Sequence, residues 1–513
     1  MAGTTSARAE KRDLSLADAL SLALANNGTL LVTREDAAIA GEEVALARAP
    51  YTPTLFAEVY TAREDQPGGA ARFPWVARER GASAGVSGRL IQTGLHYQIT
   101  FDLASGTYED PFSAVYSPVH TSFLGVSLRQ PLLRGAFGSG NRKIVAVASL
   151  RREQSKELLR AELERIVSSV QVAYWNLVRA HRERDARAAS LKLAGEQLEE
   201  SKRLARLGAR AQLDVIEAEA GVSRRRQELE AANEGVIEAE AILRGLMQVQ
   251  AGASGWEADT VIVPTDPPEL VEVNTSLEHH LALARKNRPD VVAARLRAEA
   301  EAAALEVEAN LRRPVLDLVA SAGLHGLAGT LADSYATAGV NDPMGMSPPY
   351  FTDPALQGGL GTSLGNLMSR DYYSVYLGLR FELPLGTDEA RARHAIQRRE
   401  LAKARAERRA VMAQVENEVR ASLGRLQASA AIVAAADEAV VLTERLLEGT
   451  RKRFRNDAAT SFDVLRVLDE LTRLKIEAAR ARARYQVALS RLEEANGTLL
   501  DRLGITVESL DRR

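Results

Sequence analysis

The stretch from Arg451 to Leu500 repeats apolar and small residues at alternating steps of three and four. Beyond a short elbow, Asn456 to Ser461, these residues are Val464, Leu468, Leu471, Leu474, Ala478, Ala481, Tyr485, Ala488 and Leu492. The mean step of about 3.5 is the period of helices packed as a coiled coil. Thr460 and Ser461 can accept hydrogen bonds from the first N–H groups of the second helix, and Asp463 lies in its first turn, where the helix dipole favours a negative charge. We therefore expect two long helices joined by this elbow.

The same arrangement occurs earlier, from Ser201 to Met247. Its segment Leu213-Asp214-Val215-Ile216 corresponds to Phe462-Asp463-Val464-Leu465, with one residue more in the earlier elbow. The correspondence extends outward to three further pairs: Pro131-Leu132 with Pro384-Leu385, Pro53-Thr54-Leu55 with Pro314-Val315-Leu316, and Asn27 with Asn287. The chain is therefore predicted to be a tandem duplication of a unit of about 250 residues.

Between the helical tracts the period changes to two. Apolar and polar residues alternate in Leu55–Tyr60, Ala82–Leu90, Leu95–Leu103, Leu124–Arg129, Leu316–Ala320 and Tyr373–Glu382. Segments of about ten residues with one apolar face are typical of transmembrane β-barrel strands. By itself the alternation is equally compatible with the edge of a soluble sheet.

The connections between these segments favour the barrel. Arg63–Arg80, Gly106–Val119 and Leu327–Asp371 are predicted to be long loops rich in Pro and Gly, whereas Gln92-Thr93-Gly94 is a tight turn. Outer-membrane barrels have long loops outside the cell and short turns inside.

Proline marks out the long helices. All 17 prolines fall outside Leu132–Val263 and Leu385–Arg513, and proline in a helix interior removes a donor and clashes with the preceding turn. A helix from Asn141 to Leu207 would be roughly 100 Å long. That length suits a tube better than a globular core. Gly252 to Asn274, with three prolines, is predicted to link the two halves.

Composition excludes several classes of partner, site and membrane anchor. The net charge of −2 gives no reason to expect a nucleic-acid partner, and the absence of cysteine excludes disulfides and thiolate metal sites. No run of eighteen apolar residues is present, so we expect no transmembrane helix. The N-terminus lacks the apolar core of a signal peptide, from which we expect a mature form with a replaced start.

The ordered double occurrence of these features resembles the TolC-like outer-membrane efflux proteins. Gln130-Pro131-Leu132-Leu133-Arg134-Gly135, which enters a helix, adds to the match, and the resemblance runs from about Leu14 to about Leu503. It implies an α+β membrane protein with a duplicated helix–strand–strand–helix unit. In that fold, a homotrimeric transmembrane β-barrel is continued by a long periplasmic α-helical coiled-coil barrel.

The expected division of the chain follows the repeat. It comprises a flexible N-terminus (1–13), repeat 1 (14–250: helix 15–49, barrel strands 54–130, helical hairpin 141–248), a linker (251–275), repeat 2 (276–503: helix 276–312, strands 315–383, hairpin 388–500) and a C-terminal tail (504–513). The family has four strands per chain, hence about twelve in the trimer. The hairpin at 82–103 is additional. Either it also crosses the membrane, which would give about six strands per chain, or it extends the barrel or the loops beyond the membrane; we expect four crossing strands.

The implied function is a passive channel-tunnel of a tripartite efflux or type I secretion system in the Gram-negative outer membrane. Its partners would be a periplasmic adaptor (membrane fusion) protein, an inner-membrane RND or ABC transporter, and outer-membrane lipid. The alternative is a soluble periplasmic coiled-coil adaptor or scaffold. Amphipathic strands and two helical hairpins argue against that alternative, because adaptors carry one long hairpin.

The resemblance also implies a constriction at the elbows. Asp463 matches the family's constriction aspartate, so three copies would form an acidic ring that favours cations; Asp463 as a plain helix cap is the alternative. A second acid one turn later is replaced by Arg466, which could pair with Asp463 or Asp214. Phe454 stands where the family has a hydroxyl-bearing aromatic that bonds to the acid at Asp214, and that hydrogen bond should be absent.

Adaptor docking is implied at the same tips. The expected docking residues are Leu204, Leu207, Gly208, Asn456, Asp457, Ala459, Thr460 and Ser461. Ala459 also replaces the arginine of a second family latch, and Gly208 could equally be an ordinary helix C-cap.

We expect no catalytic, cofactor or metal site. The seven histidines are scattered, and the adjacent pair His279-His280 would point about 100° apart on a helix. Gly135–Lys143 is rich in glycine but matches neither a P-loop nor a dinucleotide fingerprint. Arg224-Arg225-Arg226 is interpreted as a solvated helix face.

Overall fold

The computed structural model describes residues 11–66, 75–109, 115–207, 211–249, 260–332, 353–383, 388–456 and 458–505. Contacts divide the chain into two compact units. The helical unit comprises Met1–Ile39, Glu153–Arg297 and Arg405–Arg513, and the sheet unit comprises Ala40–Arg152 and Ala298–Ala404. Each unit therefore draws on both halves of the duplicated sequence.

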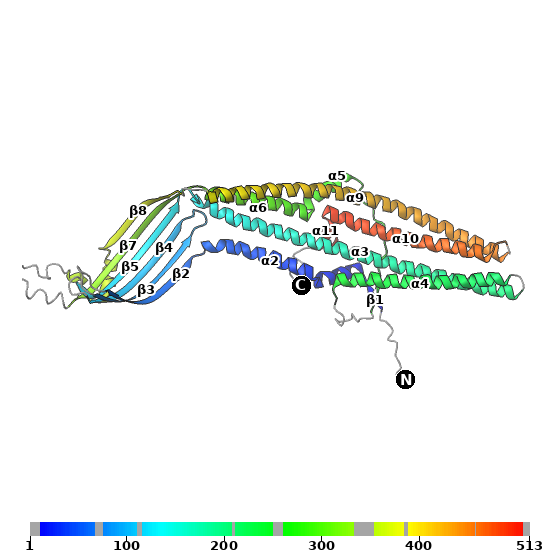
Figure 1. Ribbon diagram of the computed structural model, residues 1–513, viewed down its shortest axis with the longest axis horizontal. Helices are drawn as coiled ribbons and strands as arrows, with labels where there is room; N and C mark the ends of the chain where they lie inside the picture. Colours follow the sequence, from blue (N-terminus) through cyan, green and yellow to red (C-terminus); the bar gives the residue numbers. More distant parts are fainter. Residues whose placement is uncertain are drawn as a thin grey trace, which may run out of the picture. The chain divides into compact units, whose positions relative to one another are not determined.

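Helix lengths repeat between the two halves (Figure 1). The corresponding pairs are α1 (Leu16–Asn26) and α5 (Leu277–Asn287), 11 residues each; α2 (Gly28–Arg48) and α6 (Pro289–Leu311), 21 and 23; α3 (Ser139–Arg206) and α9 (Asp388–Arg455), 68 each; and α4 (Gln212–Met247) and α10 (Ser461–Asn496), 36 each. A short α11 (Leu499–Leu503) follows. These equal lengths support the duplication read from the sequence.

The helix ends follow from local sequence. Ser15 and Thr460 each form a capping box with an aspartate three residues on, Asp18 and Asp463 respectively. Asn27 separates α1 from α2, and its side chain accepts from the N–H groups of Thr29 and Leu30. At the far end of α10, Gly497 adopts φ 67°, a conformation that glycine reaches without the penalty a Cβ would impose.

A two-stranded parallel sheet lies in the helical unit. It pairs β1 (Lys11–Leu14) with β6 (Val261–Pro264). Tyr174 of α3, fully buried, donates to the Leu14 carbonyl at 3.1 Å and also bonds to the Asp266 carboxylate. The prediction of a flexible N-terminus through residue 13 is therefore wrong for residues 11–13, because strand pairing and the buried tyrosine hold them.

Helix α9 contradicts one expectation from composition. It is long enough, and has an 18-residue window apolar enough, to cross a membrane by those criteria alone. Apolar residues of the same helix, Leu423, Leu426 and Val433, are instead packed against Tyr485 and Leu489 of α10. Only 17 % of the apolar window is buried in the single chain, however, so most of its surface stays open there.

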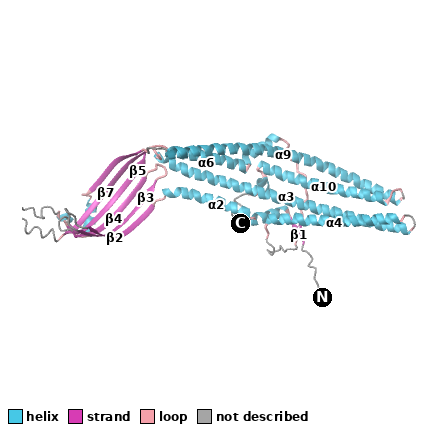
Figure 2. Cartoon of the chain, viewed as in Figure 1, coloured by secondary structure: helices cyan, strands magenta, loops and turns pink. Residues whose placement is uncertain are grey.

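The sheet unit contains six antiparallel strands in the order β2-β3-β4-β5-β7-β8 (Figure 2). Their bounds are β2 (Thr54–Gln66), β3 (Trp75–Arg89), β4 (His96–Glu109), β5 (Tyr116–Pro131), β7 (Val315–Leu331) and β8 (Tyr373–Glu382). The sheet thus has six strands, and the number that crosses the membrane stays a prediction. The additional hairpin, β3 and β4, is inserted between β2 and β5 and is paired along its length. Its tight turn uses Gly94 at φ 75°.

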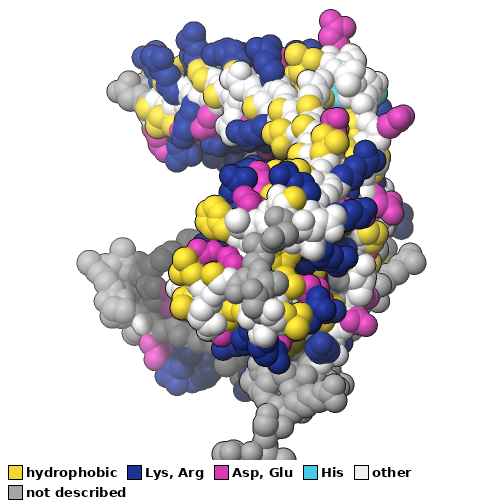
Figure 3. Space-filling model, turned by 90° about the vertical axis from the view of Figure 1, so that its right-hand side faces the viewer, with side chains coloured by type: hydrophobic (Ala, Val, Ile, Leu, Met, Phe, Trp, Pro, Cys, Tyr) yellow, Lys and Arg dark blue, Asp and Glu magenta, His cyan; other side chains and the backbone are white. Residues whose placement is uncertain are grey.

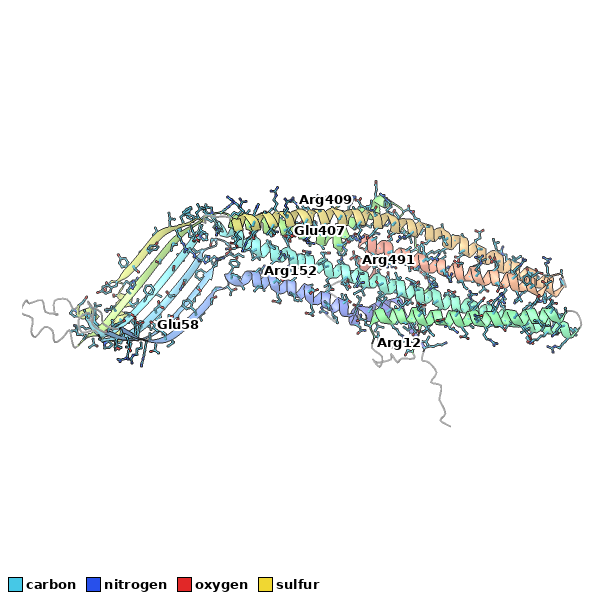
Figure 4. All side chains as sticks on the ribbon, in the orientation of Figure 1. Arg12, Glu58, Arg152, Glu407, Arg409 and Arg491 are labelled. Carbon is cyan, nitrogen blue, oxygen red and sulfur yellow. The ribbon has the colours of Figure 1, made fainter. Side chains whose placement is uncertain are left out.

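The register gives the sheet one apolar and one polar face, because residues directly opposite one another share a face. Leu55, Val86, Ile99 and Val126 stand in one row across four strands on the apolar face. On the polar face the corresponding row is Glu58, Ser83, Asp102 and Phe123; Glu58 is labelled in Figure 4. This arrangement matches the alternation read from the sequence.

Aromatic rings lie over glycines on the polar face. A Cβ at Gly81 would overlap the ring of Tyr60, and one at Gly323 would overlap the ring of Phe123. Glycine in a strand leaves a gap that a neighbouring ring can cover. These rings fill the space on the polar face where the glycines have no side chain.

The three predicted loops are shorter than expected, because β2, β4 and β7 continue past the predicted strand ends to Gln66, Glu109 and Leu331. Part of Leu327–Asp371 is helical. After the 3₁₀ turn Pro354–Leu356, α8 (Leu360–Ser369) packs on β5 and β7. Ser122 donates to the Ser363 carbonyl at 3.0 Å, and a Cβ at Gly326 would overlap that same oxygen. Gly326 therefore permits this close approach.

Candidate functional site at the helical elbows

The second elbow joins α9 to α10, and Asp463 and Thr460 share three hydrogen bonds there. The Asp463 carboxylate accepts from the Thr460 N–H at 3.0 Å and the Thr460 hydroxyl at 2.8 Å, while the Asp463 N–H donates to the Thr460 hydroxyl at 3.2 Å. The hydrogen bond from the Thr460 backbone holds the pKa of Asp463 below its usual value. Asp463 is thus a charged helix cap in the single chain.

Arg466 lies near this carboxylate but binds it weakly. Its guanidinium is 4.0 Å from the Asp463 carboxylate, and both side chains are well exposed. A solvent-exposed pair of this length contributes little to stability. Of the two partners expected for Arg466, Asp463 is the one within ion-pair distance.

Phe454 is part of the elbow core. It is 3 % exposed and packs in a cluster with Ala194 of α3 and Val464, Leu465 and Leu468 of α10. In this position the ring anchors α9 against α10 through apolar contact. The cluster explains why a phenylalanine suffices there.

The predicted docking residues differ in their exposure. Ser461 is fully buried, with its hydroxyl 3.4 Å from that of Ser201, so its surface is closed to a partner in this chain. Leu204 and Ala459 are half-buried against the elbow core. The exposed members are Leu207, Asn456 and Thr460. Gly208 and Asp457 lie outside the described residues.

Large apolar side chains are exposed at both elbows. Leu207 is 73 % exposed and Phe462 60 %, and Leu213 and Ile216 at the start of α4 are similarly open. Figure 3, which views the chain from the elbow end, shows hydrophobic side chains interspersed with basic and acidic ones. Exposed apolar side chains grouped in this way are typical of a surface that binds another protein surface.

A buried arginine joins the two hairpins above the elbows. Arg225 of α4 is 1 % exposed; it donates to the Leu465 carbonyl of α10 at 3.2 Å and to the Ser190 hydroxyl of α3 at 3.2 Å. It also pairs with the Asp469 carboxylate, which Arg224 contacts as well at 2.5 Å. The interpretation of Arg224-Arg225-Arg226 as a solvated face is therefore wrong for Arg225.

The sequence contains a pattern that predicts the burial of Arg225. Ala218, Gly221 and Arg225 follow one another at steps of three and four, so Arg225 lies on the small-residue face of α4. Gly221 leaves space there: a Cβ on it would come within 3.2 Å of the Arg225 guanidinium and 3.3 Å of Leu465.

Among the described residues, no group of three His, Asp or Glu side chains could hold a metal ion. Of the pair His279-His280, the second residue is buried and hydrogen-bonded. The buried ring of His280 lies 2.8 Å from the Asn274 carbonyl and 2.9 Å from the Asn496 amide.

Comparison with known proteins agrees with the fold. Residues 281–498 match the sequence family described as outer membrane efflux protein. No protein among the curated sequences matches significantly. A membrane protein from Pseudomonas aeruginosa superposes with a TM-score of 0.62 at 18 % identity, over 94 % of this chain and 92 % of that one.

Two further solved structures share this architecture. The CmeC outer membrane channel of Campylobacter jejuni has a TM-score of 0.62 at 14 % identity, over 94 % of this chain and 86 % of that one. The outer membrane protein VceC of Vibrio cholerae has a TM-score of 0.60 at 17 % identity, over 94 % and 96 %. The second half of the chain thus matches the outer membrane efflux protein family, and the fold shared with these outer membrane channels spans nearly the whole chain.

Proposed function

We propose that the protein is a passive channel-tunnel of the outer membrane, through which an export system moves its substrate from the periplasm to the exterior. The observation that carries this proposal is one six-stranded sheet with an apolar face and two unpaired edges, on a chain whose other elements are long paired helices.

The apolar face of the sheet suits lipid. In the single chain Val59 of β2 is 85 % exposed, and Val375, Leu377 and Leu379 of β8 are each about 70 % exposed. A continuous apolar face of this kind is rarely left to water. In an outer-membrane barrel the same face meets the acyl chains, and the polar face lines the lumen.

The unpaired edges require further copies of the chain. β2 and β8 each have one neighbour in the sheet, and an open strand edge cannot be left in lipid because its backbone groups would lack partners. In a homotrimer, β8 of one copy would pair with β2 of the next. Three sheets of six strands would then close a barrel of eighteen, in place of twelve. A barrel of that size leaves room for an aqueous channel.

Exposed apolar side chains on the helices support the same assembly. Leu31 and Val32 of α2, Ile237 of α4, and Leu442 and Leu446 of α9 are each about half exposed or more. Long helices with apolar stripes on their outer surfaces bury them against other helices. In the trimer the three sets of helices would form a coiled-coil tunnel in the periplasm.

The elbows would be the periplasmic entrance. Three Asp463 carboxylates would surround the axis there and favour cations, with Asp214, Arg466 and Phe454 in the surrounding contacts. The exposed residues Leu207, Asn456 and Thr460, with Gly208 and Asp457, would receive the hairpin tips of a periplasmic adaptor. An inner-membrane transporter of the RND or ABC class would supply the energy.

The test is the assembly and conductance of the protein purified in detergent. We expect a trimer by light scattering and discrete openings in a planar bilayer, with eighteen strands visible by electron cryomicroscopy. A monomer that stays soluble without detergent and conducts no current would exclude the channel and favour the alternative, a soluble periplasmic adaptor or scaffold.

A further inference from the structure

One row of the polar face is strongly basic. Arg89 of β3 stands opposite His96 of β4, and His96 stands opposite Arg129 of β5. The three side chains therefore project from neighbouring strands on the same face. Both arginines keep their charge at any physiological pH.

The hydrogen bonds in this row leave one arginine without an acceptor on His96. Arg89 Nε donates to His96 Nε2 at 2.8 Å, and Arg129 Nη2 lies 3.3 Å from His96 Nδ1. A neutral imidazole has one acceptor nitrogen and one N–H, whereas a guanidinium can only donate. His96 can therefore accept from one of the two arginines, and the other guanidinium needs an acceptor from elsewhere.

No carboxylate of the described residues serves as that acceptor. Among the described residues, no carboxylate lies within ion-pair distance of Arg89 or Arg129. Arg89 also donates to the Asn141 amide oxygen, at 3.5 Å, a long and weak contact. Two guanidinium groups thus face the same space without an anionic partner.

A hollow of about 670 Å³ opens at this row. Arg89, His96, Arg129 and Arg380 line it together with the polar side chains of Gln98 and Ser127. Every charged residue of its lining is an arginine. Two acids stand beside it on the same face: Asp317, which is buried opposite Arg380 on the neighbouring strand and whose charge also acts on His96, and Glu382, which pairs with Arg380 at 3.3 Å where both are exposed. The volume is that of a site for a drug-sized molecule.

We propose that this hollow, the arginine pocket, binds organic anions that carry carboxylate or sulfonate groups. Such groups have the planar or trigonal oxygens that guanidinium pairs recognise. An anionic oxygen between Arg89 and Arg129 would accept from the guanidinium N–H groups that have no acceptor on His96. Gln98 and Ser127 would form hydrogen bonds with other polar atoms of the bound anion. Binding itself needs only the sheet of one chain; that the pocket faces the lumen of a channel rests on the proposed function.

The experiment measures binding by fluorescence anisotropy of pyrene trisulfonate added to the protein purified in detergent. We expect saturable binding that weakens with salt, and about tenfold weaker binding in Arg129→Gln, since a charge-assisted hydrogen bond is lost. Arg129→Lys should bind with intermediate affinity. The control is Arg63→Gln, at the other end of the sheet, where the side chain is exposed and paired with Asp65 at 3.0 Å; it should bind as the wild type does.

Several results would overturn the proposal. They are no binding to the folded wild-type protein, equal affinities in wild type and Arg129→Gln, or equal weakening by the control. Competition by inorganic phosphate as effective as that by an organic sulfonate would show a site for small anions only. The wild-type salt titration decides the matter even if a variant does not fold. Because no current is measured, failure here leaves the conductance test of the channel independent.

Discussion

Arg225 and Asp469 connect α4 to α10 through an ion pair in which the arginine is buried and the aspartate half-exposed. The first residue comes from the first repeat and the second from the second, 244 positions apart. The pair therefore joins the two helical hairpins of the duplicated unit close to their elbows.

The first prediction concerns this pair. Asp469→Asn should destabilise the helical unit by about 1–3 kcal/mol, because it leaves a buried guanidinium without its counter-charge. The measurement is urea unfolding followed by circular dichroism. Asp185→Asn, which removes an exposed partner of Arg184, is the matched control and should change stability by less than about 0.5 kcal/mol. Equal effects of the two variants would contradict the structural role of Arg225.

A second prediction uses two glycines of the same helix. Gly235→Ala should stabilise α4 by about 0.5–1 kcal/mol, because its Cβ would meet nothing and alanine is the better helix former. Gly221→Ala should lose that gain, since its Cβ would press on Arg225 and Leu465. Stabilities measured by urea unfolding compare the two. A gain at both positions would mean that Arg225 has space to spare.

The two glycines and Arg225 illustrate what the sequence could and could not predict. The duplication, the long helices and the alternating strands follow from repeated spacing over many residues. Arg225 does not, because three consecutive arginines look solvated unless each is assigned to a helix face. The alternation of apolar and polar residues predicted the hairpin of β3 and β4. The expected number of strands was nevertheless four, because it was taken from the family. Helix α8 was missed because its glycines resemble a loop, although Gly326 on β7 is what lets it pack.

A third prediction separates the two roles of Asp463. Asp463→Ala should lower the free energy of unfolding, because the capping box with Thr460 is lost. Asp463→Asn should keep part of the cap while removing the charge. If three copies form an acidic ring, both variants should lose cation selectivity in planar bilayers, whereas Arg466→Gln should keep it. Unchanged selectivity in both Asp463 variants would leave the residue only its capping role.

The pH dependence of that cap follows from the sign of its pKa shift. Because the pKa of Asp463 is lowered in the folded protein, its contribution is fully present above the pKa of the unfolded chain. It is lost as the pH falls through the lower, folded value. The stability difference between wild type and Asp463→Asn should therefore shrink under strongly acidic conditions.

A fourth prediction concerns Glu164 in α3, which is 3 % exposed. Burial raises its pKa to about 8, and Arg160, 4.0 Å away, offsets this only in part. The folded protein then holds a proton that the unfolded chain releases near pH 4.5, so this contribution to stability is present below that pH and is lost as the pH rises through about 8. Glu164→Gln should flatten the decline of stability between these values, measured by urea unfolding at several pH values. Glu199→Gln, at an exposed position, should leave the decline unchanged.

The last prediction tests which face of the sheet meets lipid. Ala320 and Ser321 are consecutive residues of β7; Ala320 stands opposite Leu128 and Leu377 on the apolar face, and Ser321 opposite Ser127 and Tyr376 on the polar face. Arginine on the lipid face near the bilayer midplane costs about 2–4 kcal/mol. Ala320→Arg should therefore fold poorly into phospholipid vesicles after dilution from urea, while Ser321→Arg should fold nearly as well as wild type. Since both variants carry the same new charge on the same strand, a reversed order would place the apolar face toward the lumen, and equal folding would argue that this sheet does not enter the bilayer.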